Sequence, residues 1–140
     1  MDAKQLESIR LRIDLAQDKL TLARKLTVDG YYNDAVSKAY YAMFYASRAL
    51  LLAIGEDPHK HTGVVSLFGE HFVKTGKTDA RFGRTLAVAK RLREESDYDE
   101  RKHATKEEAG QAIADADEFI REVQRLLADV LPGAEVSDGR

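Results

Sequence analysis

The segment RLREESDY, residues 91–98, contains the side chains of this sequence that are best suited to binding a phosphate group. Arg93 continues a helical stripe that includes Phe82 and Leu86, so a permanent positive charge stands where a further apolar residue is expected. A guanidinium can bind phosphate through two parallel hydrogen bonds. Asp97 lies four residues after Arg93 and can pair with it. The pattern therefore predicts either a phosphate site or a structural ion pair.

The histidines offer a second candidate site. His59 and His61 stand just before a predicted helix, whose first free amide groups can hold an anion. Their spacing is too weak to define a metal site, and no carboxylate cluster accompanies them, so we predict neither a metal nor another cofactor. His61 is a candidate phosphate ligand, with an exposed or capping histidine as the alternative. The chain has no cysteine, which excludes disulfides and thiolate chemistry.

The stretch KAYYAMFYASRALLLAIG, residues 38–55, is apolar on nearly every side of the helix that it predicts. One neighbouring helix cannot cover such a surface. The helix must therefore lie at the centre of a bundle or bury its second face against another subunit. Tyr41 on that second face is a candidate platform for a nucleotide base, and an aromatic-rich core helix is the alternative.

Helical periodicity and helix-end signals predict the elements that position these residues. An apolar stripe begins at Leu6, and a second stripe of leucines widens that face. Gly30 is expected to end this helix. A short third helix is predicted over 62–73. The stripe of the first helix comprises Leu6, Ile9, Ile13, Ala16, Leu20 and Ala23, widened by Leu11, Leu15, Leu22 and Leu26.

Capping signals mark where the other helices begin. Asn33 is predicted to cap the second helix, which runs to about Ile54, and Asp79 to cap the fourth. Thr105 and Glu108 have the spacing of a capping box that opens the fifth helix. Without a strand signal, these elements predict an all-α, antiparallel up-and-down bundle of four long helices and one short one.

Length and charge limit the remaining possibilities. The chain has 140 residues, which predicts one domain over 1–131, followed by a polar tail over 132–140. Its net charge of −2 gives no general attraction to nucleic acid. The cations between Lys90 and Lys102 alternate with five acidic residues, which is weak support for an RNA surface. No signal peptide or membrane span is evident, so we expect a cytoplasmic protein.

Three segments together resemble the HEPN superfamily: the AYYAMFYA helix, the HTG sequence after the proline turn, and RLREESDY. The similarity extends from Ala16 to Phe119 and is closest to the small stand-alone prokaryotic members, which are often encoded beside a minimal nucleotidyltransferase. This resemblance implies a helical bundle that forms a homodimer. It also implies a toxin or defence role, in many members as a metal-independent endoribonuclease that the nucleotidyltransferase partner counteracts.

The catalytic motif of that family is missing from this sequence. Nuclease members carry an arginine, four to six intervening residues and a histidine, and none of the four histidines here has an arginine at that distance. Tyr98 stands where the shortest spacing would place the histidine. A phenol with a pKa of about 10 is a poor general base at neutral pH, whereas an imidazole with a pKa of about 6.5 is well suited.

Two functions therefore remain open. The chain can be a non-catalytic HEPN module that binds a nucleotide or RNA at a dimer groove, through Arg93, Asp97, His61 and Tyr41, beside a nucleotidyltransferase. Alternatively, it is an endoribonuclease with a divergent catalytic site that includes Arg93 and Tyr98. The resemblance further implies that Tyr98 is a candidate for modification by AMP, unless its ring only packs against the helix end.

Overall fold

The computed structural model describes residues 1–131, and the predicted tail at 132–140 lies outside these described residues. The described chain forms four long α-helices and one short one, as the sequence predicts, and no strand. A π-helical turn, η1, continues the short helix. The elements are α1 (Ala3–Val28), α2 (Tyr32–Ala53), α3 (His61–Phe68), η1 (Gly69–Val73), α4 (Ala80–Tyr98) and α5 (Lys106–Val130).

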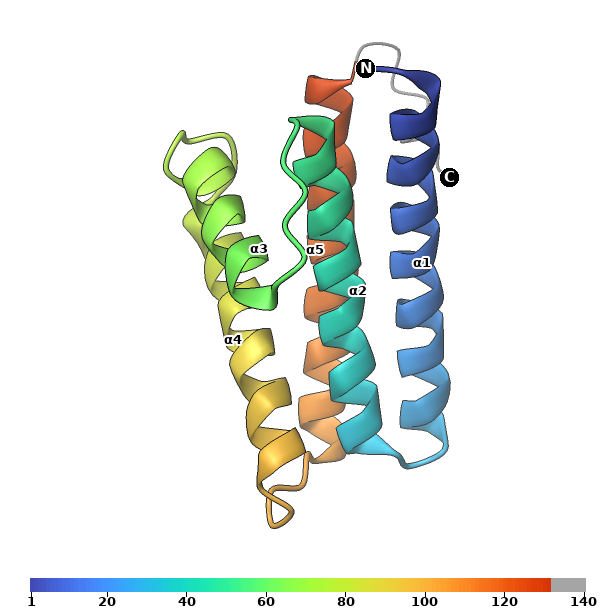
Figure 1. The fold of residues 1–140 in the computed structure, drawn as a ribbon. Coiled ribbons are helices and arrows are strands. Elements are labelled where there is room, and N and C mark those ends of the chain that lie inside the picture. Colours follow the sequence, from blue (N-terminus) through green and yellow to red (C-terminus); the bar gives the residue numbers. More distant parts are fainter. Residues whose placement is uncertain (132–140) are drawn as a thin grey trace.

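The four long helices alternate in direction, so that consecutive helices run antiparallel (Figure 1). Helix α2 lies between α1 and α4 and also packs along α5, which confirms the predicted central position of the aromatic helix. Short α3 lies against the upper part of α4. None of these helices combines the length and the apolar character needed to cross a bilayer.

The helix ends follow the predicted local chemistry with one exception. Gly30, at a φ of 89°, ends the turn after α1 in a conformation that glycine adopts without strain. The Asp79 side chain accepts a hydrogen bond from the Arg81 amide at 2.8 Å and caps α4. Thr105 and Glu108 form the predicted capping box of α5. These three predictions are confirmed.

The prediction that Asn33 caps α2 is wrong. The helix begins two residues earlier than an Asn33 cap would place it, after Tyr31, and no side chain caps it. The Asn33 side chain instead bridges to the loop before α5. It accepts a hydrogen bond from the Ala104 amide at 2.6 Å and donates one to the Lys102 carbonyl at 3.2 Å. The Asn33 side chain therefore forms hydrogen bonds with a loop distant in the sequence, although its local propensity favours a helix cap.

The core follows the predicted stripes closely. Residues of α1 at three- and four-residue spacing are buried against α2, whereas the second leucine stripe is only partly covered, and Leu11 is 59% exposed. Phe119 of α5 contacts Phe68 and Phe82, with ring centroids 5.3 and 6.3 Å away, so one aromatic cluster joins α3, α4 and α5. This cluster fixes the upper half of α4, whose lower half extends beyond it (Figure 1).

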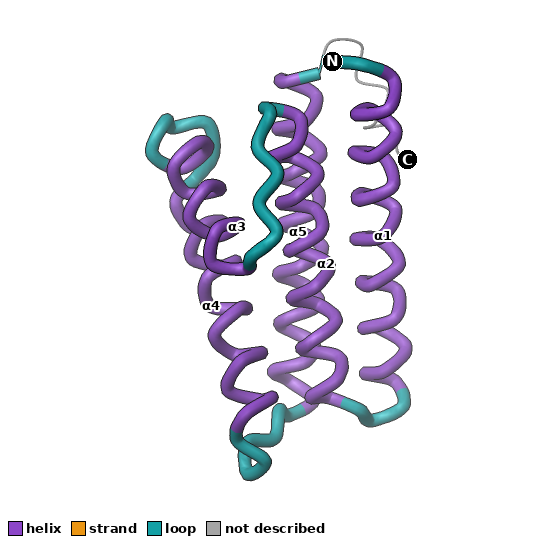
Figure 2. The backbone as a smooth tube through the Cα atoms, in the orientation of Figure 1, coloured by secondary structure: helices purple, strands orange, loops and turns teal. Residues whose placement is uncertain are grey.

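An extended segment over 54–60 joins α2 to α3. It turns back after α2 and runs alongside that helix before α3 begins (Figure 2). Asp57 anchors the segment, because its carboxylate pairs with Arg12 of α1 at 3.0 Å and with Arg48 of α2 at 3.2 Å. This anchoring places His61, the first residue of α3, against the middle of α2.

Candidate phosphate site at the junction of α2, α3 and α4

Arg93 extends the inward-facing stripe of α4 beyond the apolar core. Its side chain is only 19% exposed. The guanidinium carbon lies 5.2 Å from the ring centre of Tyr41 and 5.8 Å from that of Tyr40, both on α2. These separations allow cation–π attraction. The charge predicted from the sequence therefore lies on an aromatic surface and not in open solvent.

The hydrogen-bonding capacity of Arg93 is only partly used. One terminal nitrogen pairs with Asp97 at 3.1 Å, which confirms that the predicted ion pair forms. The Nε atom is buried and has no hydrogen-bond partner among the described residues. Because a guanidinium has five N–H donors, an ion pair with one carboxylate oxygen leaves donors for an additional anion.

His61 lies on the same aromatic surface. Its Nδ1 atom is 2.6 Å from the hydroxyl oxygen of Tyr40. Its ring stacks on Phe44 with centroids 4.2 Å apart and an interplanar angle of 16°, and it meets the Tyr41 ring edge-on at 5.8 Å. The structure thus brings together three of the candidate residues, Arg93, Tyr41 and His61, from three different helices.

The surroundings determine the charge of the two hydrogen-bonded partners. Burial lowers the pKa of His61, and the positive charges of Arg93 and Lys90 lower it further. Burial likewise raises the pKa of Tyr40 well above its usual value. At neutral pH the pair therefore consists of a neutral imidazole and a protonated phenol.

Sequence reasoning identified neither Tyr40 nor the Asp57 anchor as part of this site. Tyr40 is only 1% exposed. A buried tyrosine hydroxyl requires a hydrogen-bond partner, which is the signal that could have indicated a nearby polar residue. The partners of Asp57 carry no such signal, because Arg12 and Arg48 lie on different helices.

Most of the other cations near the end of α4 are already neutralised. Lys90 pairs with Glu94 at 2.7 Å and Arg91 with Glu95 at 2.9 Å, both one helical turn apart. Lys102 also reaches Glu95, at 3.6 Å. The interrupted charge pattern of the sequence therefore becomes a row of ion pairs, and Arg93 differs from the others by its aromatic contacts.

Tyr98 does not join this site within one chain. It is the last residue of α4, and it is 86% exposed. Five residues of α-helix rotate a side chain by roughly 140° relative to Arg93, so the two point to different sides of α4. No aromatic or cation–π contact links them among the described residues. His103 is exposed in the loop before α5.

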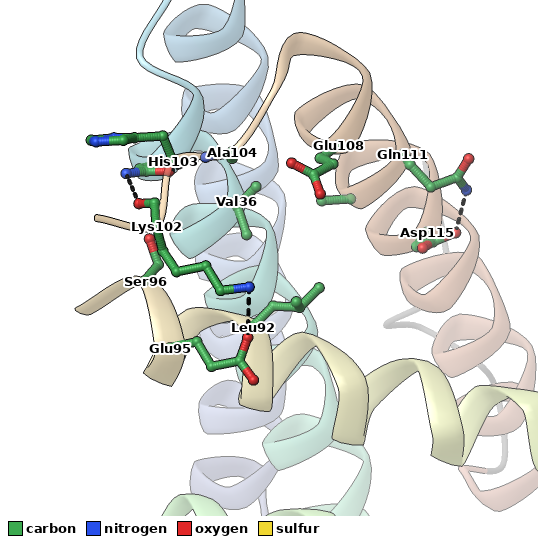
Figure 3. A pocket seen from close by; sticks show the side chains of 12 residues that line it. Val36, Leu92, Glu95, Ser96, Lys102, His103, Ala104, Glu108, Gln111 and Asp115 are labelled. Atoms are coloured by element: carbon green, nitrogen blue, oxygen red, sulfur yellow. Dashed lines mark hydrogen bonds and ion pairs between the residues drawn. The ribbon is translucent and has the colours of Figure 1, made fainter. Parts of the chain in front are cut away.

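A groove lies between α4 and α5, and Tyr40 of the aromatic surface lines one part of it. Figure 3 shows its lower part, where Leu92 and Val36 form an apolar floor and Lys102, Glu95 and Glu108 lie around it. This part has a volume of about 260 Å³. An adjoining cavity of about 350 Å³ shares Leu92 and Val36 and extends toward Val88. Within residues 1–131, no three histidine or acidic side chains gather as a metal site.

Comparison with known proteins gives a consistent result. A family model described as the HEPN domain matches residues 9–126. A protein of Methanocaldococcus jannaschii named "Putative toxin MJ0605" is 37% identical over 125 residues, which cover 89% of this chain and 92% of that protein. A UPF0332 protein of Gloeobacter violaceus is 36% identical over 117 residues, covering 83% and 93%. One of Thermotoga maritima is 34% identical over 115 residues, covering 82% and 87%.

Proposed function

The chain belongs to the HEPN domain family, and from that premise we propose that it is the toxin-like component of a two-protein module with a nucleotidyltransferase. In this role it binds the phosphate of a nucleotide or of single-stranded RNA at Arg93. The observation that carries the proposal is the position of a largely buried guanidinium over two tyrosine rings. The toxin name of the Methanocaldococcus jannaschii relative agrees with a toxin-like role.

The contacts of Arg93 suggest how such a ligand would be held. Free guanidinium donors can bind a phosphate oxygen, because only one nitrogen pairs with Asp97. A base can then stack on the partly exposed ring of Tyr41, which is a sequence-tolerant contact in single-stranded nucleic-acid binding. Asp97 holds Arg93 in place and limits binding of anions that cannot also stack.

A second copy of the chain would complete the groove. Val88 and Leu92 are 43% and 40% exposed on the surface of α4, beside the cavities between α4 and α5. Apolar side chains on one helix face are a suitable contact for a twofold dimer. Leu92→Glu is expected to shift the protein from dimer to monomer in light scattering at micromolar concentration, whereas Leu11→Glu on α1 serves as the matched control. A monomeric wild-type protein would contradict the dimer.

Tyr98 is the proposed site of control by the nucleotidyltransferase. Its exposed hydroxyl oxygen would attack the α-phosphorus of ATP, form a new O–P bond, release pyrophosphate and give its proton to solvent. The added AMP brings a negative charge to the end of α4 and repels an RNA ligand. Peptide mass spectrometry after incubation with the cognate nucleotidyltransferase and ATP tests this role. AMP on another residue, or on none, would contradict it.

Arg93→Ala tests the proposal as a whole. We expect loss of binding to ATP and to a single-stranded RNA oligonucleotide, measured by calorimetry and fluorescence anisotropy, with a much smaller change in stability. Arg91→Ala is the matched control, because Arg91 also pairs one turn onward but contacts no tyrosine ring. Unchanged binding in Arg93→Ala, together with marked destabilisation, would instead identify a structural ion pair.

The alternative nuclease function gives a different pattern. A divergent catalytic pair would make RNA cleavage depend on both Arg93 and Tyr98, and neither Arg93→Ala nor Tyr98→Phe would retain it. We expect no cleavage by the wild-type protein, because the sequence lacks the arginine–histidine motif. Cleavage that both substitutions abolish would favour the nuclease.

A further inference from the structure

We propose that His61 donates a hydrogen bond from its neutral Nε2–H group to the same phosphate that Arg93 binds, and that this imidazole acts in binding and not as a general base. The inference rests on the proposed function, because it assigns a second ligand to the Arg93 site. It identifies the ligand as a phosphodiester or phosphate held by one charged and one neutral donor.

The direction of the Tyr40–His61 hydrogen bond fixes the position of the imidazole proton. Tyr40 is buried, and its hydroxyl oxygen lies 2.6 Å from Nδ1 of His61. If Nδ1 carried the proton, the Tyr40 hydroxyl hydrogen would need another acceptor, and none is found among the described residues. The hydroxyl therefore donates to Nδ1. A neutral imidazole that accepts at Nδ1 carries its proton at Nε2.

The stacked rings hold this imidazole in one orientation. The Phe44 ring stacks nearly parallel to the imidazole, with ring centroids 4.2 Å apart, and the Tyr41 ring lies nearly perpendicular to it. The Nε2 atom of His61 makes no hydrogen bond with a described residue, and it is not completely buried. A ligand can therefore reach Nε2, and the donor is already oriented before the ligand arrives.

The hydrogen-bond donors around His61 favour an anion as that ligand. On α4, Arg93 and Lys90 lower its pKa, and Glu94, which is paired with Lys90, opposes them. On α2 the ring faces the hydroxyl of Tyr40 and the edge of Tyr41. Asp97 pairs with Arg93 as Glu94 does with Lys90, so these charges balance. A phosphate would therefore be bound through the unpaired guanidinium donors of Arg93 and the neutral N–H donor beside it.

The same tautomer argues against general-base catalysis by His61. A general base needs an unprotonated nitrogen within reach of the substrate. Here Nδ1 is occupied by Tyr40, and Nε2 already bears a proton. The ring would have to lose its Tyr40 hydrogen bond and change tautomer before it could accept a proton from a ribose hydroxyl.

Two amide substitutions test the roles of the two ring nitrogens of His61 separately. His61→Asn places a carbonyl near the Nδ1 position and can still accept from Tyr40, but it loses the outer donor. His61→Gln places an amide N–H near the Nε2 position. With a 2′-O-methyl RNA oligonucleotide as the probe, which cannot be cleaved through its 2′ oxygen, we expect His61→Asn to bind about tenfold to a hundredfold more weakly. His61→Gln should retain most of the affinity.

Two further measurements distinguish failure of this inference from failure of the proposed function. Nitrogen NMR of the unliganded protein should place the imidazole proton on Nε2, and a proton on Nδ1 would overturn the inference. Affinity for the oligonucleotide should be constant from pH 7 to 8.5, whereas a charged imidazolium ligand would lose affinity as pH rises. Wild-type affinity in His61→Asn, with binding lost in Arg93→Ala, overturns only the role of His61. Wild-type affinity in both variants overturns the Arg93 site as well.

Discussion

Helices α1 and α4 flank the central helix α2 on opposite sides, but they are held in different ways (Figure 1). α1 buries apolar residues at regular spacing from Ile9 to Ala23, along most of its length. α4 buries only Phe82 and Leu86, both in its first half. Its second half is held by the contact of Arg93 with two tyrosine rings and by ion pairs within the helix.

This difference determines how much each helix contributes to stability. Burial of apolar area along α1 contributes continuously to the free energy of unfolding, so that helix is committed to the core. Ion pairs at the surface contribute little, because water screens both charges. The second half of α4 therefore depends less on apolar burial than α1 does.

The largest expected effect comes from matched leucine truncations on the two helices. Leu20→Ala on α1 removes a side chain that is 1% exposed, and should lower the free energy of unfolding by about 2–5 kcal/mol. Leu92→Ala on α4, at 40% exposure, should cost less than about 1 kcal/mol. Urea unfolding of both variants measures the difference, and equal losses would remove the distinction between the helices.

A moderate effect is expected at the contact between α2 and the loop that follows α4. Asn33→Ala removes the acceptor of the Ala104 amide and the donor to the Lys102 carbonyl, and should cost about 1–2 kcal/mol. Asn33→Asp keeps the acceptor and should lose less. Hydrogen exchange should rise in the loop at 99–105 but not in α1. A uniform rise across all helices would show that the loop is not an independent unit.

The stability of the fold should depend on pH through His61, which lies near Arg93 of α4. Its pKa is lower in the folded chain than in the unfolded chain, mainly through burial and then through Arg93. The unfolded chain therefore binds this proton first as the pH falls. The stability contributed by the neutral ring is present above about pH 6.5 and decreases below it. Thermal unfolding should show a smaller loss from pH 7.5 to 5.5 in His61→Asn than in the wild type; an identical loss contradicts the assignment.

The smallest effect is expected at the exposed ion pair on the outer side of α4. Arg91→Ala should shift the melting temperature by less than about 2 °C, because its pair with Glu95 is open to solvent. Differential scanning calorimetry is precise enough to test this limit. A larger shift would mean that ion pairs and not aromatic contacts hold the second half of α4.

Part of the candidate site could be predicted from residues close together in the sequence. Arg93 was identified because it interrupts an apolar stripe, and Asp97 because it follows one helical turn later. The contacts with Tyr40 and Tyr41 could not be predicted in this way, because they join α4 to α2, two helices that are far apart in the sequence. The predicted Asn33 cap was wrong for the same reason, because the partner of Asn33, Ala104, lies 71 residues further along the chain.

From the amino-acid sequence alone, the five helices and most of their ends could be predicted, with a central position of α2 as one of two alternatives. These features follow from periodicity and capping, which act over three to seven residues. Only the folded chain shows that His61 meets Tyr40 across 21 residues and that Asp57 joins α1 to α2. Such contacts depend on the path of an irregular segment between helices. Local spacing cannot specify that path, because the energy that selects it comes from side chains far apart in the chain.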